Sequence, residues 1–153
     1  MRPGVRLGVD VGLARIGVAR CDSHGILATP VETVPRGSGD LSRIARIALE
    51  LEAIEIVVGL PLALSGNDTA STADARSFAD EISRTSRLPV RLVDERLSTV
   101  SAQSALRAAG RTTRNSRAVI DQVAAVIILQ HALDFERSAR IPPGVVVDTP
   151  EGL

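Results

Sequence analysis

Three acidic residues stand at positions where a purely structural role is strained. Asp10 follows the apolar alternation of "RLGV", Glu95 follows the strand-like stretch "PVRLVD", and Asp121 lies within "AVIDQVAAVIIL". A buried carboxylate is strongly unfavourable unless a cationic group meets it. For Asp10 the candidate partners are Arg15, a nucleotide phosphate held through a metal, and a catalytic metal ion.

A hard divalent cation would explain the three acids together. The carboxyl ends of parallel strands gather at one edge of a sheet, and carboxylates that meet there repel one another unless a cation lies among them. The chain has one cysteine and two histidines, so oxygen ligands favour Mg²⁺ or Mn²⁺ over zinc. Adjacent strand residues point to opposite faces, so we take Glu95 as the ligand and Asp94 as its alternate. Each acid alone also has an ordinary explanation, such as an ion pair of Asp121 with Arg117.

Between Glu95 and Asp121 the charged residues are all arginines. The chain contains 18 basic residues, none of them lysine, and 18 acidic residues, so this segment is locally basic although the formal net charge is zero. Arginine forks bind phosphate, and a basic strip beside carboxylates suits a nucleic acid carried across a metal site. The alternative is a solvated helix face. The strip consists of Arg96, Arg107, Arg111, Arg114 and Arg117.

Apolar periodicity predicts the elements that position these residues. Strands are expected over 5–11, 15–20, 26–34, 54–60 and 89–95. Helices are expected over 40–53, 71–86, 98–110 and 115–140, the second with a capping box of Ser71 and Asp74. This β-β-β-α-β-α-β-α-α order predicts an α/β fold with a mixed five-stranded sheet and helices on both faces. We expect one domain over 1–140 and a loose tail over 141–153.

Composition narrows the functional class. Phe78 and Phe135 are the only aromatic residues, so the stacking platforms of many single-strand binders are absent. The single cysteine, Cys21, forms no intramolecular disulfide and suits a reducing compartment. No signal peptide or apolar run of membrane-spanning length is present, so we expect a cytoplasmic protein with no membrane partner.

Four sequence blocks resemble a known family in their order and separation. They are "GVDVGLARIGVA", "VVGLPLALSG", "VDERLSTVSA" and "IDQVAAVIILQ". Together they resemble the YqgF-type family of RNase-H-like proteins, which are described as Holliday-junction resolvases and as pre-16S rRNA nucleases. The resemblance covers about residues 5–134 and implies an RNase-H-like fold with metal-dependent phosphodiester hydrolysis. Two departures are Ser98, where the family usually has threonine, and the absence of an acid at the end of the fourth strand.

The resemblance also implies roles for individual residues. By motif position, Asp10, Glu95 and Asp121 are the catalytic acids and hold two Mg²⁺ or Mn²⁺ ions, which Asp10 bridges. Arg15 matches the first block and joins the basic strip as a nucleic-acid-binding residue. The second block supplies a loop that either offers backbone N–H groups to a phosphate or serves as a tight turn. Its matching residues are Gly59, Pro61 and Gly66.

The implied function is nuclease action on structured RNA, at the 5′ end of pre-16S rRNA in ribosome biogenesis. The alternative substrate is branched DNA, because a Holliday-junction resolvase acts there and would need a symmetric homodimer. Two other functional classes remain: a nucleotide-binding module, since actin-like ATPases and sugar kinases open with a similar Gly-x-Asp-x-Gly hairpin, and a non-catalytic RNA-binding assembly factor. Thermal stabilisation by adenosine nucleotides tests the first of these, and nuclease assays with and without Mg²⁺ test the second.

Overall fold

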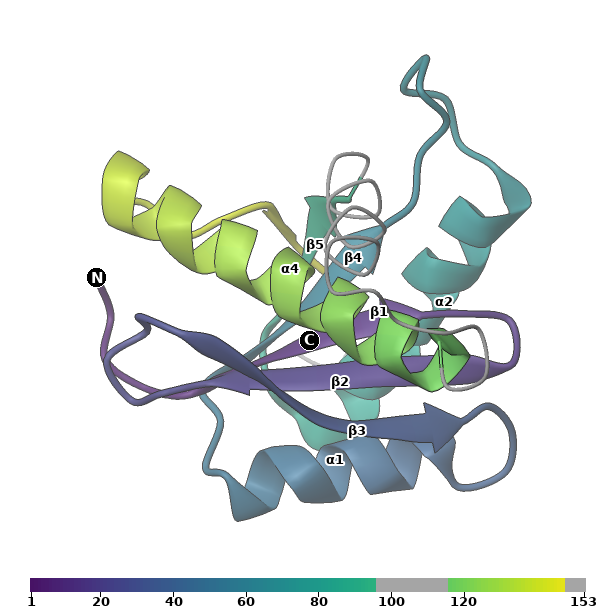
Figure 1. The fold of residues 1–153 in the computed structure, drawn as a ribbon, viewed down its shortest axis with the longest axis horizontal. Coiled ribbons are helices and arrows are strands. Elements are labelled where there is room, and N and C mark those ends of the chain that lie inside the picture. The colour runs from purple at the N-terminus through teal and green to yellow at the C-terminus, as the bar shows by residue number, and fades with distance from the viewer. Residues whose placement is uncertain (96–115, 148–153) are drawn as a thin grey trace.

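The computed structural model describes residues 1–95 and 116–147, which form a mixed six-stranded sheet and three helices (Figure 1). The sheet order is β3-β2-β1-β4-β5-β6; β1, β4 and β5 are parallel, and the remaining pairs are antiparallel. The strands are β1 (Arg6–Val11), β2 (Arg15–Cys21), β3 (Ala28–Pro35), β4 (Glu55–Leu60), β5 (Val90–Asp94) and β6 (Val145–Val146). The helices are α1 (Asp40–Glu50), α2 (Ala70–Ser86) and α4 (Ser116–Ala139).

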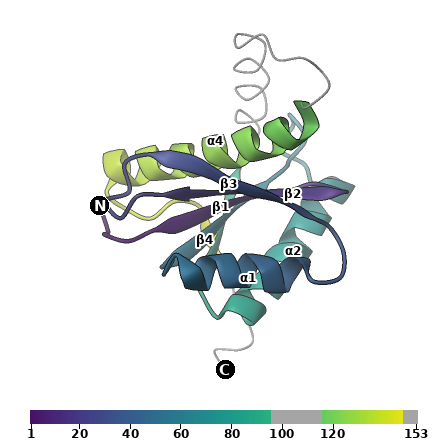
Figure 2. The ribbon, with the colours of Figure 1, turned by 60° about the horizontal axis from the view of Figure 1, so that its bottom comes forward.

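The helices cover opposite faces of the sheet. Helices α1 and α2 lie on one face and α4 crosses the other (Figure 2). Side chains alternate along each strand, so Leu7 and Val9 of β1 enter the core beneath α1 and α2, while Gly8 and Asp10 face α4. This alternation places an acid on the α4 face without interrupting the apolar core. Among the helices of the described residues, none combines the length and hydrophobicity needed to cross a membrane.

The predicted α/β class, mixed sheet and two-sided helical cover are confirmed. The sheet has a sixth strand, however, because β6 pairs with β5 in the register Leu92↔Val145. Part of the expected loose tail is therefore ordered, and the prediction of five strands was wrong. The helix expected over 98–110 lies outside the described residues.

The N-terminus of α2 also differs from the prediction. Its capping box joins Thr69 and Thr72: the Thr72 amide donates to the Thr69 hydroxyl at 3.2 Å, and the Thr69 amide donates to the Thr72 hydroxyl at 2.8 Å. The expected box of Ser71 and Asp74 lies two residues further along, inside the helix. Asp74 instead forms an ion pair with Arg36 at 2.9 Å.

Glycines set the separation between α4 and the sheet. A Cβ atom on Gly17 would lie 1.9 Å from the carbonyl oxygen of Asp121, and one on Gly8 would lie 2.7 Å from the Cβ of Leu129. Both distances are far below a van der Waals contact, so α4 occupies space that any larger residue would fill. The close approach brings Asp121 directly over β2.

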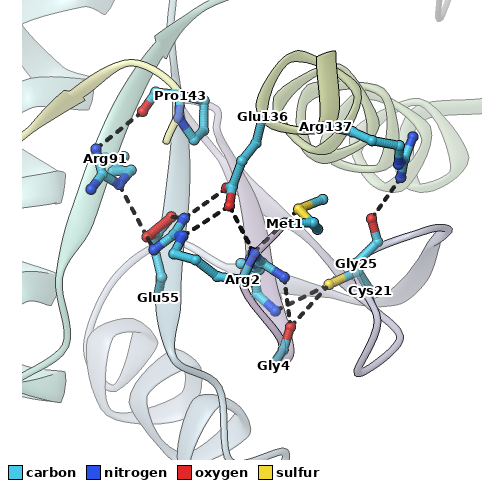
Figure 3. Close-up of polar contacts among 11 residues, drawn as sticks. Met1, Arg2, Gly4, Cys21, Gly25, Glu55, Arg91, Glu136, Arg137 and Pro143 are labelled. Atoms are coloured by element: carbon cyan, nitrogen blue, oxygen red, sulfur yellow. Dashed lines mark hydrogen bonds and ion pairs between the residues drawn. The ribbon is translucent and has the colours of Figure 1, made fainter. Parts of the chain in front are cut away.

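A buried ion network holds the other end of α4 (Figure 3). Arg2 donates to Glu55 of β4 and to Glu136 of α4, each at 2.8 Å, and its hydrogen bonds lower the pKa of Glu136 to about 2. Arg6 and Arg91 add ion pairs to Glu136 and Glu55 respectively. Removing one partner of such a buried network leaves an uncompensated charge, which is strongly destabilising. The network thus ties the N-terminal residues to β4 and to the end of α4.

Candidate active site

Two of the predicted acids meet above the middle of the sheet. Asp10 lies in β1, and Glu95 follows β5 directly. Between them runs β4, where Gly59 leaves room for the glutamate: a Cβ atom there would lie 2.2 Å from Glu95 Oε2. The Glu95 side chain therefore crosses β4 over Gly59, and its protonated carboxyl donates a hydrogen bond to the Asp10 carboxylate.

The Asp10–Glu95 pair retains a proton that isolated carboxyls would release. Burial and, to a smaller extent, the negative charge of Asp121 raise the pKa of Asp10 to about 6, against the opposing effect of the Glu95 hydrogen bond. Burial, followed by the charge of Asp10, raises the pKa of Glu95 to about 8. Within residues 1–95 and 116–147, no ion pair joins either acid to an arginine. A hydrogen bond within the pair therefore offsets part of the repulsion between the two carboxyl groups.

Asp121 has a different partner. The Nε of Arg15 donates to Asp121 Oδ2 at 2.7 Å, and the aspartate side chain is 16% exposed against 35% for the arginine. Arg15 begins β2, immediately after the hairpin turn that the Gly12 amide closes on the Arg15 carbonyl oxygen at 2.9 Å. Asp10 thus pairs with Glu95 rather than with Arg15, and Arg15 reaches the third acid of the site.

The choice between Glu95 and Asp94 follows from the alternation of β5. Glu95 is buried and turns towards Asp10, whereas Asp94 is exposed at the end of the strand. Among the described residues, no group of three acidic, histidine or cysteine side chains lies ready to hold one metal ion. The expected enclosure of two ions by three carboxylates is therefore not formed among these residues, and Asp121 is paired with Arg15 instead. The assignment of all three acids as ligands stays a prediction.

The candidate phosphate loop has local structural roles. Gly66 adopts a positive φ of 91°, and its amide donates to the carbonyl of Ala63 at 2.7 Å. Pro61 has no N–H, and its carbonyl accepts a hydrogen bond from the Thr72 hydroxyl. Gly59 makes room for Glu95. These contacts favour the tight-turn interpretation, and phosphate binding by this loop stays a prediction.

Most of the basic strip lies outside the described residues. This applies to Arg96, Arg107, Arg111 and Arg114, and to the side chain of Arg117. The sequence did not predict the Arg15–Asp121 ion pair, since 106 positions separate the two residues. The sequence did contain a signal for the steric role of Gly17 and Gly59. Both are glycines at strand positions where alternation would otherwise place a side chain against a helix.

The metal-free protein should lose stability as pH rises. Both pKa values lie above the ordinary 3.8 of aspartate and 4.5 of glutamate. As pH rises, the unfolded chain releases these protons at a lower pH than the folded protein does. The pair's contribution to the free energy of unfolding is therefore complete below about pH 4 and is lost as pH rises through about 8. Urea unfolding in EDTA should give a free energy of unfolding on the order of 2 kcal/mol lower at pH 9 than at pH 5. Asp10→Asn should flatten this dependence, and an equally steep profile would contradict the shared proton.

Comparison with known proteins places the chain in a family. The RuvX family model, described as a Holliday junction resolvase, matches residues 4–135. The chain belongs to the RuvX family. A relative from Clavibacter michiganensis subsp. michiganensis is 65% identical over 96% of this chain and 93% of its own length. One from Leifsonia xyli subsp. xyli is 61% identical over 97% of both chains. Both RuvX-like relatives bear the name "Putative pre-16S rRNA nuclease".

Solved structures show that this RuvX-family chain shares the fold of RuvC. T. thermophilus RuvC in complex with a Holliday junction substrate superposes with a TM-score of 0.59 at 16% identity, covering 92% of this chain and 99% of RuvC. A second Thermus thermophilus RuvC structure gives 0.56 at 15% identity, covering 91% and 99%. At this identity the likeness establishes the fold alone. The predicted family resemblance and RNase-H-like fold are both confirmed.

Proposed function

We propose that this chain is a metal-dependent nuclease that hydrolyses phosphodiester bonds. The Asp10–Glu95 pair carries the proposal. Two carboxyl groups, one in β1 and one directly after β5, are buried against each other and joined by a hydrogen bond. Two apolar side chains at these positions would stabilise the fold more than two buried carboxyl groups do. A divalent cation in place of the proton would satisfy both acids.

The residues present fit Mg²⁺ or Mn²⁺. Asp10 and Glu95 offer hard oxygen donors, and Gly59 leaves the space that lets the glutamate reach across β4. Asp10 and Glu95 would hold one ion, and Asp121 together with Asp10 would hold a second. When bound, the ions acidify the attacking water and stabilise the leaving oxygen.

Arg15 supplies the contact to the scissile strand. Its Nε is engaged by Asp121, while its two terminal nitrogens donate to no group among the described residues. A guanidinium fixed on one side and open on the other is suited to a phosphate, which it binds through two parallel hydrogen bonds. In the free protein, the contact with Asp121 thus keeps this guanidinium beside the acids that would hold the metal.

The proposed substrate is the 5′ end of pre-16S rRNA. Two of the relatives that are named as pre-16S rRNA nucleases are 65% and 61% identical to this chain over more than nine-tenths of their lengths. The description of the RuvX family favours a second candidate, the Holliday junction. A resolvase that cuts two strands would act as a homodimer, whereas end trimming requires one protomer.

One preparation tested on both substrates decides between the candidates. We expect cleavage of a 16S precursor RNA with Mg²⁺, none with EDTA, and weaker cleavage of a matched four-way DNA junction. Glu95→Gln should lower the rate at least about a hundredfold, whereas the matched control Asp94→Asn should retain most of it. Preferential junction cleavage would establish the second candidate. RNA binding without cleavage, or stabilisation by adenosine nucleotides alone, would contradict nuclease action.

A further inference from the structure

The three acids of the site have different partners. Asp10 and Glu95 are hydrogen-bonded to each other, whereas Asp121 is paired with Arg15. We infer that Arg15 is a positioning residue that withholds Asp121 from a cation until a nucleic-acid phosphate draws the arginine away. This inference rests on the proposed nuclease function, and it adds an order of assembly: the second ion enters with the substrate.

The backbone holds both members of the Arg15–Asp121 pair in place. Gly17 lets the Asp121 carbonyl press against β2, so the helix brings the carboxylate to the start of that strand. On the other side, Arg36 donates to the carbonyl of Gly12 at 2.8 Å and its amide donates to Ala14 at 2.9 Å, which brace the hairpin before Arg15. Neither partner is at the end of a free loop. Their contact at 2.7 Å is thus a built feature of the site.

A phosphate competes with Asp121 for Arg15, and a cation competes with Arg15 for Asp121. A phosphodiester offers the guanidinium two anionic oxygens in the geometry it prefers, and a divalent ion offers Asp121 more charge than one Nε–H does. A cation that takes Asp121 Oδ2 displaces the charge-assisted hydrogen bond from Arg15 Nε, which is worth about ten- to hundredfold in affinity. When Arg15 binds a phosphate instead of Asp121, the cation no longer has to displace this hydrogen bond.

The coupling must be reciprocal. If a phosphodiester tightens cation binding at Asp121, the cation tightens phosphodiester binding by the same factor. The free protein should therefore carry one tight cation site, formed by Asp10 and Glu95, and one weak site that involves Asp121. The weak site becomes tight only when substrate is present.

Mn²⁺ binding measures this coupling without recourse to activity. Calorimetric titration and electron paramagnetic resonance count the bound ions in the wild type, in Arg15→Gln and in the matched control Arg20→Gln. Arg20 lies on the same strand, and its side chain donates only to the Cys21 carbonyl among the described residues. Arg15→Met, whose unbranched chain preserves the packing, serves as a second variant. Dimethyl phosphate is the phosphodiester probe.

The wild type should bind a first Mn²⁺ tightly and a second about ten- to hundredfold more weakly. Arg15→Gln and Arg15→Met should tighten the second site by that factor, and Arg20→Gln should change neither. Dimethyl phosphate should tighten the second site in the wild type and not in the Arg15 variants. Equal second-site affinity in the wild type and both Arg15 variants would overturn the inference and leave the nuclease proposal intact. A wild type that binds no Mn²⁺ would overturn both.

Discussion

Replacement of Asp10 by asparagine should abolish Mg²⁺-dependent cleavage and make the metal-free protein more stable. The loss of rate should reach about a thousandfold, because the acid between the two proposed ions is worth several kcal/mol of transition-state stabilisation. The gain in stability follows from the same residue. Burial and the negative charge of Asp121 raise the pKa of Asp10, and a neutral amide in its place removes that repulsion.

Two measurements separate the parts of this prediction. Single-turnover cleavage with Mg²⁺ gives the rate, and urea unfolding in EDTA gives the free energy of unfolding. Asp134→Asn is the matched control, since it makes the same chemical change at an exposed aspartate on the distal half of α4. An Asp10→Asn protein that is destabilised and still cleaves would sink the metal assignment and indicate a structural role for the carboxylate.

Gly17→Ala should destabilise the fold by about 3 kcal/mol and remove cleavage with it. The added methyl group would lie 1.9 Å from the carbonyl oxygen of Asp121. That oxygen belongs to the helix backbone and cannot rotate aside, so α4 must move away from β2. The shift would separate Asp121 from Arg15 and from Asp10, which stand on the two strands beneath it.

Gly8→Ala provides the graded comparison. Its methyl group would meet the Leu129 Cβ at 2.7 Å and the Ala125 carbonyl at 2.9 Å, a milder conflict one turn or more further along α4. Urea unfolding should therefore rank the wild type above Gly8→Ala, and Gly8→Ala above Gly17→Ala. If Gly17→Ala were as stable as the wild type, the helix would not depend on this glycine for its position.

The local sequence pattern was sufficient to predict most of the helices and strands and the positions of two of the site's acids. Alternation in "RLGVDV" placed Asp10 on the face opposite Leu7 and Val9, and the end of the β5 pattern placed Glu95 at the same edge. The choice of Glu95 over Asp94 was also available from alternation, and the structure turns Glu95 towards Asp10. Such inferences succeed because a strand's period fixes the direction of each side chain.

The features that the sequence did not predict depend on contacts between residues far apart in the chain, or on a choice among several similar residues. Nothing near Arg15 indicates that Asp121 will meet it, and nothing near Arg2 indicates Glu55 and Glu136. The cap of α2 was misplaced because "TASTAD" contains several Ser/Thr residues that could begin a helix, and tertiary packing selects one. Strand β6 was missed because two valines in a Pro-Gly-rich tail carry little periodicity.

The order in which the ribosome makes the chain has a consequence for this fold. Asp10 and Arg15 are synthesised early, but Asp121 follows 106 positions after Arg15, and the Arg2 network closes only when Glu136 has emerged. Contacts of such long sequence separation form late in folding. A nascent chain therefore lacks Asp121 and α4 until β1 to β5 have all been made. The acid cluster is completed only when α4 packs onto the sheet.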